Sequence, residues 1–311
     1  MIEIEEPGAL TTVQDLGRHG QLRHGIPPSG PLDVAAFILA NRLAGNPDGA
    51  AGLECTLSGP RFRVLAPCAI AVTGADMPVS VNGAAMAGAS TVLLEAGDRV
   101  RIGSARAGLR AYVAFGGGLD VPLRLGSRAT YLRGRLGGLE GRALRKGDRL
   151  RTLPAQLPAV RTIAPQALPA YGDEAHVRVV LGPQADRFTA AGIAAFLGGD
   201  YRLLPQSDRM GARLEGPPIA HANGHDIVSD GIAAGSVQVP GNGQPIVLLV
   251  DRQSTGGYTK IATVCSFDLG RVGQLRPGQR LRFEAIEVTQ AHERLREWRT
   301  MLDRILAPVA R

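Results

Sequence analysis

The phrase Gly97-Asp-Arg-Val-Arg-Ile102 decides the fold class, because it returns as Gly147-Asp-Arg-Leu-Arg-Thr152 and again as Gly278-Gln-Arg-Leu-Arg-Phe283. Each copy opens with a glycine, which tolerates the positive φ of a tight turn. The residues that follow alternate between polar and apolar, which is the period of a strand with one buried face. Each copy therefore predicts a turn that leads into a half-buried strand whose arginines face outward.

The rest of the chain has the same character. Its 41 glycines and 21 prolines are spread along the sequence, as expected for many short strands joined by tight turns. We therefore predict a mainly β fold with few helices. Further strands are expected at residues 2–5, 70–73, 91–94, 109–115, 176–181, 235–239 and 245–250, and helices at residues 32–44, 184–197 and 288–305.

The length of 311 residues suggests two lobes, because single domains are usually shorter. Residues 153–170 are rich in proline and alanine and are the best candidate for a linker. We expect an N-terminal β lobe over residues 1–155, a C-terminal β lobe over residues 171–290 and a C-terminal helix over residues 288–311.

Composition narrows the possible functions. The net charge is +7, but the arginines are scattered and only 4% of residues are aromatic, which argues against nucleic-acid binding. An acidic partner subunit or an anionic small substrate accounts for the charge equally well. The three cysteines lack metal-ligand spacing, so no metal site is expected. An acidic start without a signal peptide, and no apolar run of membrane-spanning length, predict a cytoplasmic protein that does not enter a membrane.

One lysine stands out, because Lys146 and Lys260 are the only lysines among 35 basic residues. Lys146 lies in an ordinary charged turn, whereas Lys260 ends the polar stretch Asp251-Arg-Gln-Ser-Thr-Gly-Gly-Tyr-Thr-Lys260. A compact ammonium on a flexible stem is not replaceable by a guanidinium. We therefore predict a functional role for Lys260. The alternative is a tight hairpin that an Asp251–Lys260 salt bridge closes.

The stretch before Lys260 predicts how such a site works. A buried strand delivers Asp251, and the glycines that follow offer backbone N–H groups to an anion or an oxyanion. Tyr258 and Lys260 alternate onto one face and can polarise a carbonyl. The predicted catalytic residues are Lys260, Tyr258 and Asp251, and the predicted substrate-binding residues from this stretch are Arg252, Gln253, Thr255, Gly256 and Gly257.

Two other polar clusters join the prediction. Gln238 lies on a predicted strand, just before an Asn242-Gly243 pair that is typical of a hairpin turn. Asp208 and Arg209 precede a glycine, and the structural alternative for them is a salt bridge in a turn. We include Gln238, Asp208 and Arg209 among the substrate-binding candidates.

A further group of polar residues lies in an N-terminal loop that Pro27 and Pro28 stiffen. We predict that this loop contributes to a site or to a subunit interface. Replacing its Asp15 by asparagine should then weaken activity or assembly and leave the melting temperature nearly unchanged. The alternative is turn chemistry before a helix. The residues concerned are Gln14, Asp15, Arg18, Ser29 and Asp33.

These clusters contain motifs that identify a family. Three of them are Leu10-Thr-Thr-Val-Gln-Asp-Leu-Gly-Arg18, Pro27-Pro-Ser-Gly-Pro-Leu-Asp33 and Ser207-Asp-Arg-Met-Gly211, and the longest continues from Asp251 through Lys260 to Thr263. With them, the chain resembles the allophanate hydrolase subunit 2 family over residues 3–285. This family, also called the biotin-dependent carboxyltransferase family, includes the 5-oxoprolinase C subunit, the antagonist of the sporulation kinase inhibitor, and part of urea carboxylase.

The resemblance implies two cyclophilin-like β-barrel lobes and a companion protein from the family of allophanate hydrolase subunit 1 and the 5-oxoprolinase B subunit. It favours a subunit of an ATP-dependent 5-oxoprolinase, which opens 5-oxoproline to glutamate together with a lactam-utilisation subunit. One alternative is carboxyl transfer from carboxybiotin to urea or a related amide. The other is a non-enzymatic regulator that binds a companion resembling the kinase inhibitor. The expected substrate is a small amide or lactam.

Overall fold

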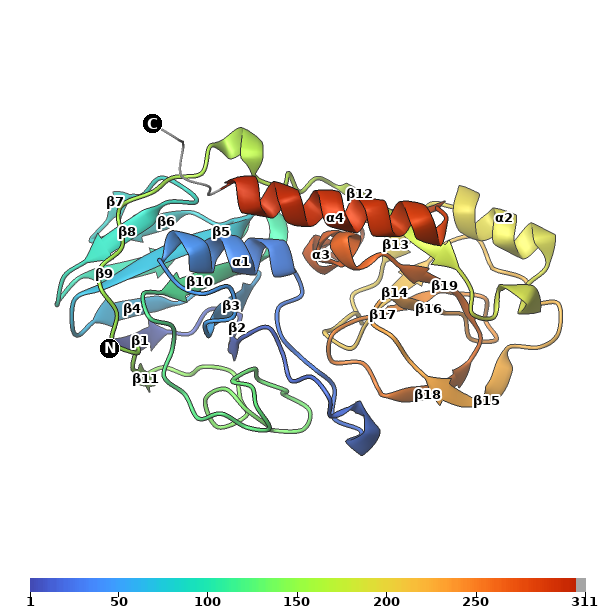
Figure 1. Ribbon diagram of the computed structural model, residues 1–311, viewed down its shortest axis with the longest axis horizontal. Coiled ribbons are helices and arrows are strands. Elements are labelled where there is room, and N and C mark those ends of the chain that lie inside the picture. Colours follow the sequence, from blue (N-terminus) through green and yellow to red (C-terminus); the bar gives the residue numbers. More distant parts are fainter. Residues whose placement is uncertain (306–311) are drawn as a thin grey trace. The chain divides into compact units, whose positions relative to one another are not determined.

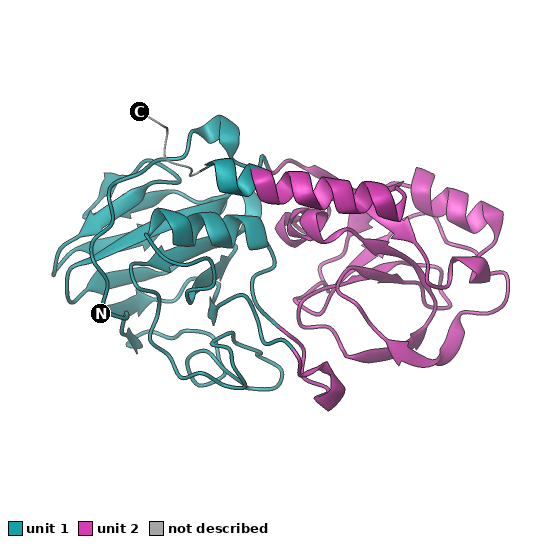
Figure 2. Ribbon diagram, viewed as in Figure 1, with its two compact units in different colours: residues 1–19, 29–170, 301–311 teal, residues 20–28, 171–300 magenta. Residues whose placement is uncertain are grey.

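The computed structural model describes residues 1–305, which fold as two compact units. Figure 2 colours them separately. Unit 1 comprises residues 1–19, 29–170 and 301–305. Unit 2 comprises residues 20–28 and 171–300. Each unit has its own sheets, and each is considered by itself below.

Unit 1 contains two antiparallel sheets that share one apolar core (Figure 1). Phe62 of one sheet packs against Phe115 of the other, with 5.7 Å between ring centroids. The six-stranded sheet has the order β11 (Arg149–Leu150), β1 (Ile2–Glu6), β4 (Arg61–Val64), β9 (Arg99–Ile102), β6 (Val79–Val81) and β7 (Ala84–Ala85). The five-stranded sheet has the order β2 (Leu10–Gln14), β3 (Gly52–Thr56), β10 (Ala107–Phe115), β5 (Cys68–Asp76) and β8 (Thr91–Leu94).

One helix, α1 (Val34–Leu43), packs against strands β5 and β10 of unit 1. Asp33 begins it, since the Asp33 carboxylate accepts a hydrogen bond from the backbone N–H of Ala36 at 3.1 Å. The ring of Phe37 then meets the edge of Tyr112 in β10 at 6.0 Å. This confirms the helix predicted at residues 32–44.

Unit 2 is a closed barrel with a two-stranded ribbon attached. Strand β12 (Glu174–Leu181) closes the barrel by pairing in parallel with β20 (Arg280–Ala285). The other barrel strands, in order from β12, are β19 (Lys260–Val264), β16 (Ser236–Gln238), β17 (Ile246–Leu248), β14 (Gly211–Glu215) and β13 (Tyr201–Leu203). The ribbon consists of β15 (Asp226–Gly231) and β18 (Thr255–Tyr258).

The helices of the second half are short except for the last. They are α2 (Ala190–Gly198), α3 (Leu269–Gln274) and α4 (Val288–Ile305), with 3-10 turns at Pro165–Ala167, Ala185–Arg187 and Ser266–Asp268. A further 3-10 turn lies near the N-terminus at Leu22–His24. The helix predicted at residues 184–197 is split, because Thr189 caps a new helix by accepting a hydrogen bond from Gly192 N. The last six residues of the predicted C-terminal helix, 306–311, lie outside the described residues.

The repeated turn-and-strand phrase behaves as predicted. Gly97, Gly147 and Gly278 all have φ between +87° and +101°. Strands β9, β11 and β20 follow these turns, and in β9 the two arginines are exposed while Val100 and Ile102 are buried. The prediction of a mainly β fold with few short helices is therefore confirmed. Within residues 1–305, we find no helix with the length and apolar character that crossing a membrane requires.

Candidate functional site

Lys260 is buried at the first position of β19 in the barrel of unit 2. Its backbone N–H donates to Gln184 Oε1 at 3.1 Å, which fixes the start of the strand. Its ammonium faces the Asp230 carboxylate, with 3.5 Å between Nζ and Oδ2. The Lys260 side chain is 2% exposed and that of Asp230 is 58% exposed. A buried charge is costly unless it is paired and hydrogen-bonded. Because this one contact is long, the Lys260 ammonium still has N–H groups that can donate hydrogen bonds to a ligand.

Gln238 lies beside Lys260, because β16 and β19 are paired with these two residues in register. Its Oε1 accepts a long hydrogen bond of 3.4 Å from Gln253 Nε2. Its Nε2 is buried and has no partner among the described residues. An unsatisfied buried donor costs about 1–3 kcal/mol, so this amide is a good candidate to bind an oxygen acceptor from a ligand.

Gly256 makes room for that amide. A Cβ at this position would lie 2.7 Å from Gln238 Nε2 and 2.7 Å from Ile232 Cδ1. A Cβ would have to displace the ends of these two side chains, so glycine allows the ribbon and the Gln238 amide to approach without such a shift. The structure therefore brings together Lys260, Gln238, Gln253 and Gly256 from the predicted set.

The glycines of the motif do not form the predicted anion-binding loop. Thr255, Gly256 and Gly257 belong to strand β18, where Gly256 is paired with Asp230 of β15. Neither glycine has a positive φ, and a concave nest of N–H groups requires left-handed residues. The predicted glycine loop is therefore an extended, paired strand, whereas binding of an anion by its N–H groups stays a prediction.

Tyr258 and Lys260 do not share a face, contrary to the prediction. Strand β18 ends at Tyr258 in the ribbon, and β19 begins at Lys260 in the barrel, so alternation does not continue across Thr259. The Tyr258 side chain is exposed, and its ring lies 6.4 Å from that of His225. Thr259 itself is buried, and its hydroxyl has no partner among the described residues.

Asp251 also departs from the prediction. It is buried and forms an ion pair with Arg209, at 2.9 Å between Asp251 Oδ2 and Arg209 Nε. The Asp251–Lys260 salt bridge that the alternative interpretation required is therefore absent, since Asp251 pairs with Arg209 and Lys260 with Asp230. Asp208, next to Arg209, accepts hydrogen bonds from the N–H groups of Met210 and Gly211, which is turn chemistry.

Arg252 is a second buried cation near this site. Its Nε donates to the Ile232 carbonyl at 3.0 Å and its Nη1 to the Leu249 carbonyl at 3.3 Å. Burial lowers the pKa of the Arg252 guanidinium. The Ile232 side chain lies beside Gly256 of the ribbon. By donating to the Ile232 carbonyl, Arg252 helps to fix this residue at the site.

The predicted N-terminal cluster belongs to unit 1, where it holds the long loop at residues 119–145. The Asp15 carboxylate accepts from Ser127 Oγ at 2.6 Å and from Arg128 N at 2.5 Å. The Arg18 guanidinium donates to the carbonyls of Arg124 and Ala129 at 2.8 and 2.9 Å. These contacts favour a structural role for both residues.

The other members of the cluster are also buried. Gln14 Nε2 donates to the Thr130 carbonyl at 3.2 Å, and Gln14 Oε1 accepts from Gly30 N at 3.1 Å. Ser29 has a φ of 58° and a hydroxyl without a partner among the described residues. Asp33 is the helix cap described above.

Replacing Asp15 by asparagine is accordingly expected to lower stability, not only assembly. The amide would place N–H donors against donors from Ser127 or Arg128, leaving one buried group unsatisfied at a cost of about 1–3 kcal/mol. Thermal unfolding of the chain measures this. Asp120→Asn is the matched control, because Asp120 is exposed. An unchanged melting temperature for Asp15→Asn would restore the original prediction of an interface role.

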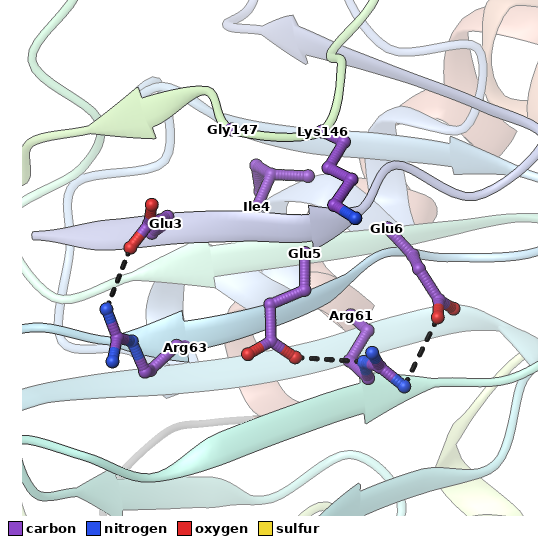
Figure 3. A pocket seen from close by; sticks show the side chains of 8 residues that line it. All are labelled: Glu3, Ile4, Glu5, Glu6, Arg61, Arg63, Lys146 and Gly147. Atoms are coloured by element: carbon purple, nitrogen blue, oxygen red, sulfur yellow. Dashed lines mark hydrogen bonds and ion pairs between the residues drawn. The ribbon is translucent and has the colours of Figure 1, made fainter.

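A hollow on the outer face of the six-stranded sheet is lined by charged residues (Figure 3). Its charges are largely satisfied internally. Arg63 pairs with Glu3 at 3.0 Å, and Arg61 pairs with Glu5 at 2.9 Å and with Glu6 at 3.2 Å. These pairs lower the pKa of Glu3 and, together with the hydrogen bond from Arg99, that of Glu5. We therefore interpret this hollow as a charged sheet surface.

Sequence reasoning missed one residue of the barrel site, which is Asp230. The polar segment from His221 to Asp230 was not singled out, and no strand was predicted over β15. Its proximity to Lys260 depends on the pairing of two strands that are far apart in sequence. Among residues 1–305, no group of three His, Cys, Asp or Glu side chains is placed to hold a metal ion.

Several known proteins resemble this chain in sequence and in structure. Residues 24–285 match the family of the carboxyltransferase domain, subdomain A and B. The chain is 36% identical over 308 residues to the 5-oxoprolinase C subunit of Escherichia coli (strain K12), covering 96% of this chain and 98% of that protein. It is 35% identical to the urea amidolyase of Lachancea kluyveri, covering 94% of this chain but 17% of that protein. The crystal structure of the K. lactis urea amidolyase matches with a TM-score of 0.92 at 32% identity, over 98% of this chain and 20% of that chain.

Proposed function

The chain belongs to the family of the carboxyltransferase domain, subdomain A and B, and we propose from this premise that it is the C subunit of a 5-oxoprolinase. Similarity over almost the full length of the E. coli protein supports this function. The observation that carries the chemistry is the pair of donors in the barrel, a buried ammonium and a buried amide without a partner among the described residues.

In this proposal the two donors bind the lactam carbonyl of 5-oxoproline. Gln238 and Lys260 are directly paired on β16 and β19, so their side chains lie on the same face of the sheet. In the proposal, one oxygen accepts from both donors. Addition of water to the lactam carbonyl places negative charge on that oxygen until the C–N bond breaks and the ring opens. Donors that are already fixed stabilise this charge without reorganisation. Each such donor is worth about 3 kcal/mol, or on the order of a hundredfold in rate.

ATP is part of the proposed reaction, and the sequence contains no familiar nucleotide-binding motif. The sequence contains no glycine-rich loop ending in Gly-Lys-Ser or Gly-Lys-Thr. The extended backbone of Gly256 and Gly257 also does not form a phosphate nest. We therefore assign no step through ATP to the residues of this chain. In the proposal, the enzyme is completed by a companion from the 5-oxoprolinase B subunit family and by a lactam-utilisation subunit.

Carboxyl transfer from carboxybiotin is the second candidate. The TM-score of 0.92 to part of a urea amidolyase favours it, and the same donors would suit the carboxyl oxygens of that group. A complex that consumes ATP with urea and a biotinylated carrier, and not with 5-oxoproline, would select this alternative. Tight binding of the companion without turnover of either substrate would select the regulator.

We expect the purified chain to have no 5-oxoprolinase activity by itself, because its donors bind an oxygen but supply no phosphate site. Adding the companion and lactam-utilisation subunits should produce glutamate from 5-oxoproline in an ATP-dependent manner. The measurement is glutamate formation with each protein omitted in turn. Turnover by this chain alone would contradict the proposal, and so would full activity of the other two proteins without it.

A further inference from the structure

We propose that Asp230 is a positioning residue that keeps the Lys260 side chain charged and directs its ammonium at the substrate oxygen. This role rests on the proposed function. Asp230 lies on β15 of the ribbon, opposite Gly256, and its Oδ2 is 3.5 Å from Lys260 Nζ. Among the described residues, it is the one carboxylate within 4 Å of that ammonium.

Among the described residues near Lys260, Asp230 is the one that can balance the charge of the ammonium. The neighbouring side chains on the barrel side are Gln238 and the backbone-bound Gln184, and both are neutral. Asp251 forms its ion pair with Arg209. Arg252 is itself a cation, and it donates hydrogen bonds to backbone carbonyls, including that of Ile232. Within residues 1–305 no second negative charge pairs with the ammonium, and a buried ammonium without a counter-ion loses its proton more easily.

The ribbon that carries Asp230 is suited to hold its carboxylate at a long hydrogen-bond distance from the Lys260 ammonium. Figure 1 shows β15 and β18 at the edge of unit 2, away from helices α2 and α3. Most residues of β15 are exposed, and Val228 is 92% exposed. Since the contact between Asp230 and Lys260 is long, the ammonium keeps donors free for a ligand while the charge remains balanced.

A titration that does not depend on activity tests the pairing. Lysine labelled with ¹³C at Cε gives two side-chain resonances in this chain, because only Lys146 and Lys260 are present. Lys146→Arg assigns them. In Asp230→Asn we expect the Lys260 resonance to titrate at a lower pH than in the unchanged chain, because the counter-ion is lost. Lys146 should be unaffected and serves as the internal control.

Asp226→Asn is the matched control variant. Asp226 lies on the same strand and is exposed, but it is 3.3 Å from His225 and has no ion pair with Lys260. This variant should leave the Lys260 titration unchanged. Equal titration of Lys260 in the unchanged chain and in Asp230→Asn would overturn the proposal.

Kinetics of the reconstituted complex test the consequence for catalysis. Asp230→Asn should lower kcat about tenfold because the ammonium is no longer directed at the substrate oxygen, whereas Asp230→Glu should recover part of the activity. A shifted titration with unchanged kcat would also overturn a positioning role. Should the unchanged complex lack 5-oxoprolinase activity, the proposed function and Asp230's part in that reaction would both fail, while the titration still decides whether the two residues are coupled.

Discussion

Lys260→Arg is expected to lower turnover of the reconstituted complex about a hundredfold while the chain stays folded. The ammonium is buried where β16 meets β19, with Gln238 beside it and the Ile232 side chain near Gly256. A planar guanidinium is larger and cannot place a donor at the same point, although it keeps the charge. Removing one donor of this kind typically costs about 10²–10³ in kcat.

The second lysine provides the control. Lys146 is exposed in a turn, so Lys146→Arg should retain full activity and the same melting temperature. The measurements are kcat and KM for 5-oxoproline, with thermal unfolding of each variant. Near-normal turnover of Lys260→Arg would remove Lys260 from the reacting centre. A collapse in stability with normal activity per folded molecule would assign it a structural role.

The fold class followed from local signals that are physically strong. A glycine with positive φ followed by strict alternation fixes a turn and the buried face of the next strand, and Gly97 with Val100 and Ile102 shows this. Helix α1 was likewise predicted, at residues 32–44, although its Asp33 cap was not singled out. These features depend on residues within one or two turns of each other, so no knowledge of distant contacts is needed.

The site was only partly predictable, because its contacts join distant segments. The unusual lysine and the polar stretch around it directed attention to Lys260, and an isolated glutamine on a strand directed it to Gln238. The error came from extending strand alternation through Thr259, where the chain passes from the ribbon to the barrel. The partner of Lys260 is Asp230, and strand pairing over that separation has no local signature.

The ion pair of Asp251 with Arg209, which the sequence analysis did not predict, gives the largest expected effect on stability. The Asp251–Arg209 pair is buried, with side-chain exposures of 6% and 7%. Arg209→Met is expected to reduce the free energy of unfolding by about 3–5 kcal/mol, because it leaves the Asp251 carboxylate buried without a counter-charge. Urea unfolding followed by the fluorescence of Trp298, the single tryptophan, measures this within unit 2.

Two further variants separate the loss of a pair from the loss of packing. Arg61→Met removes an exposed ion pair with Glu5 and should cost less than about 1 kcal/mol. Combining Arg209→Met with Asp251→Leu removes both charges, and it should recover much of the lost stability because no buried charge then remains unpaired. If Arg209→Met reduced the free energy of unfolding no more than Arg61→Met, water would have to reach the Asp251 carboxylate, and the expectation of a buried unpaired charge would be wrong. If the double variant recovered nothing, the guanidinium would stabilise unit 2 through packing and hydrogen bonds that do not involve Asp251.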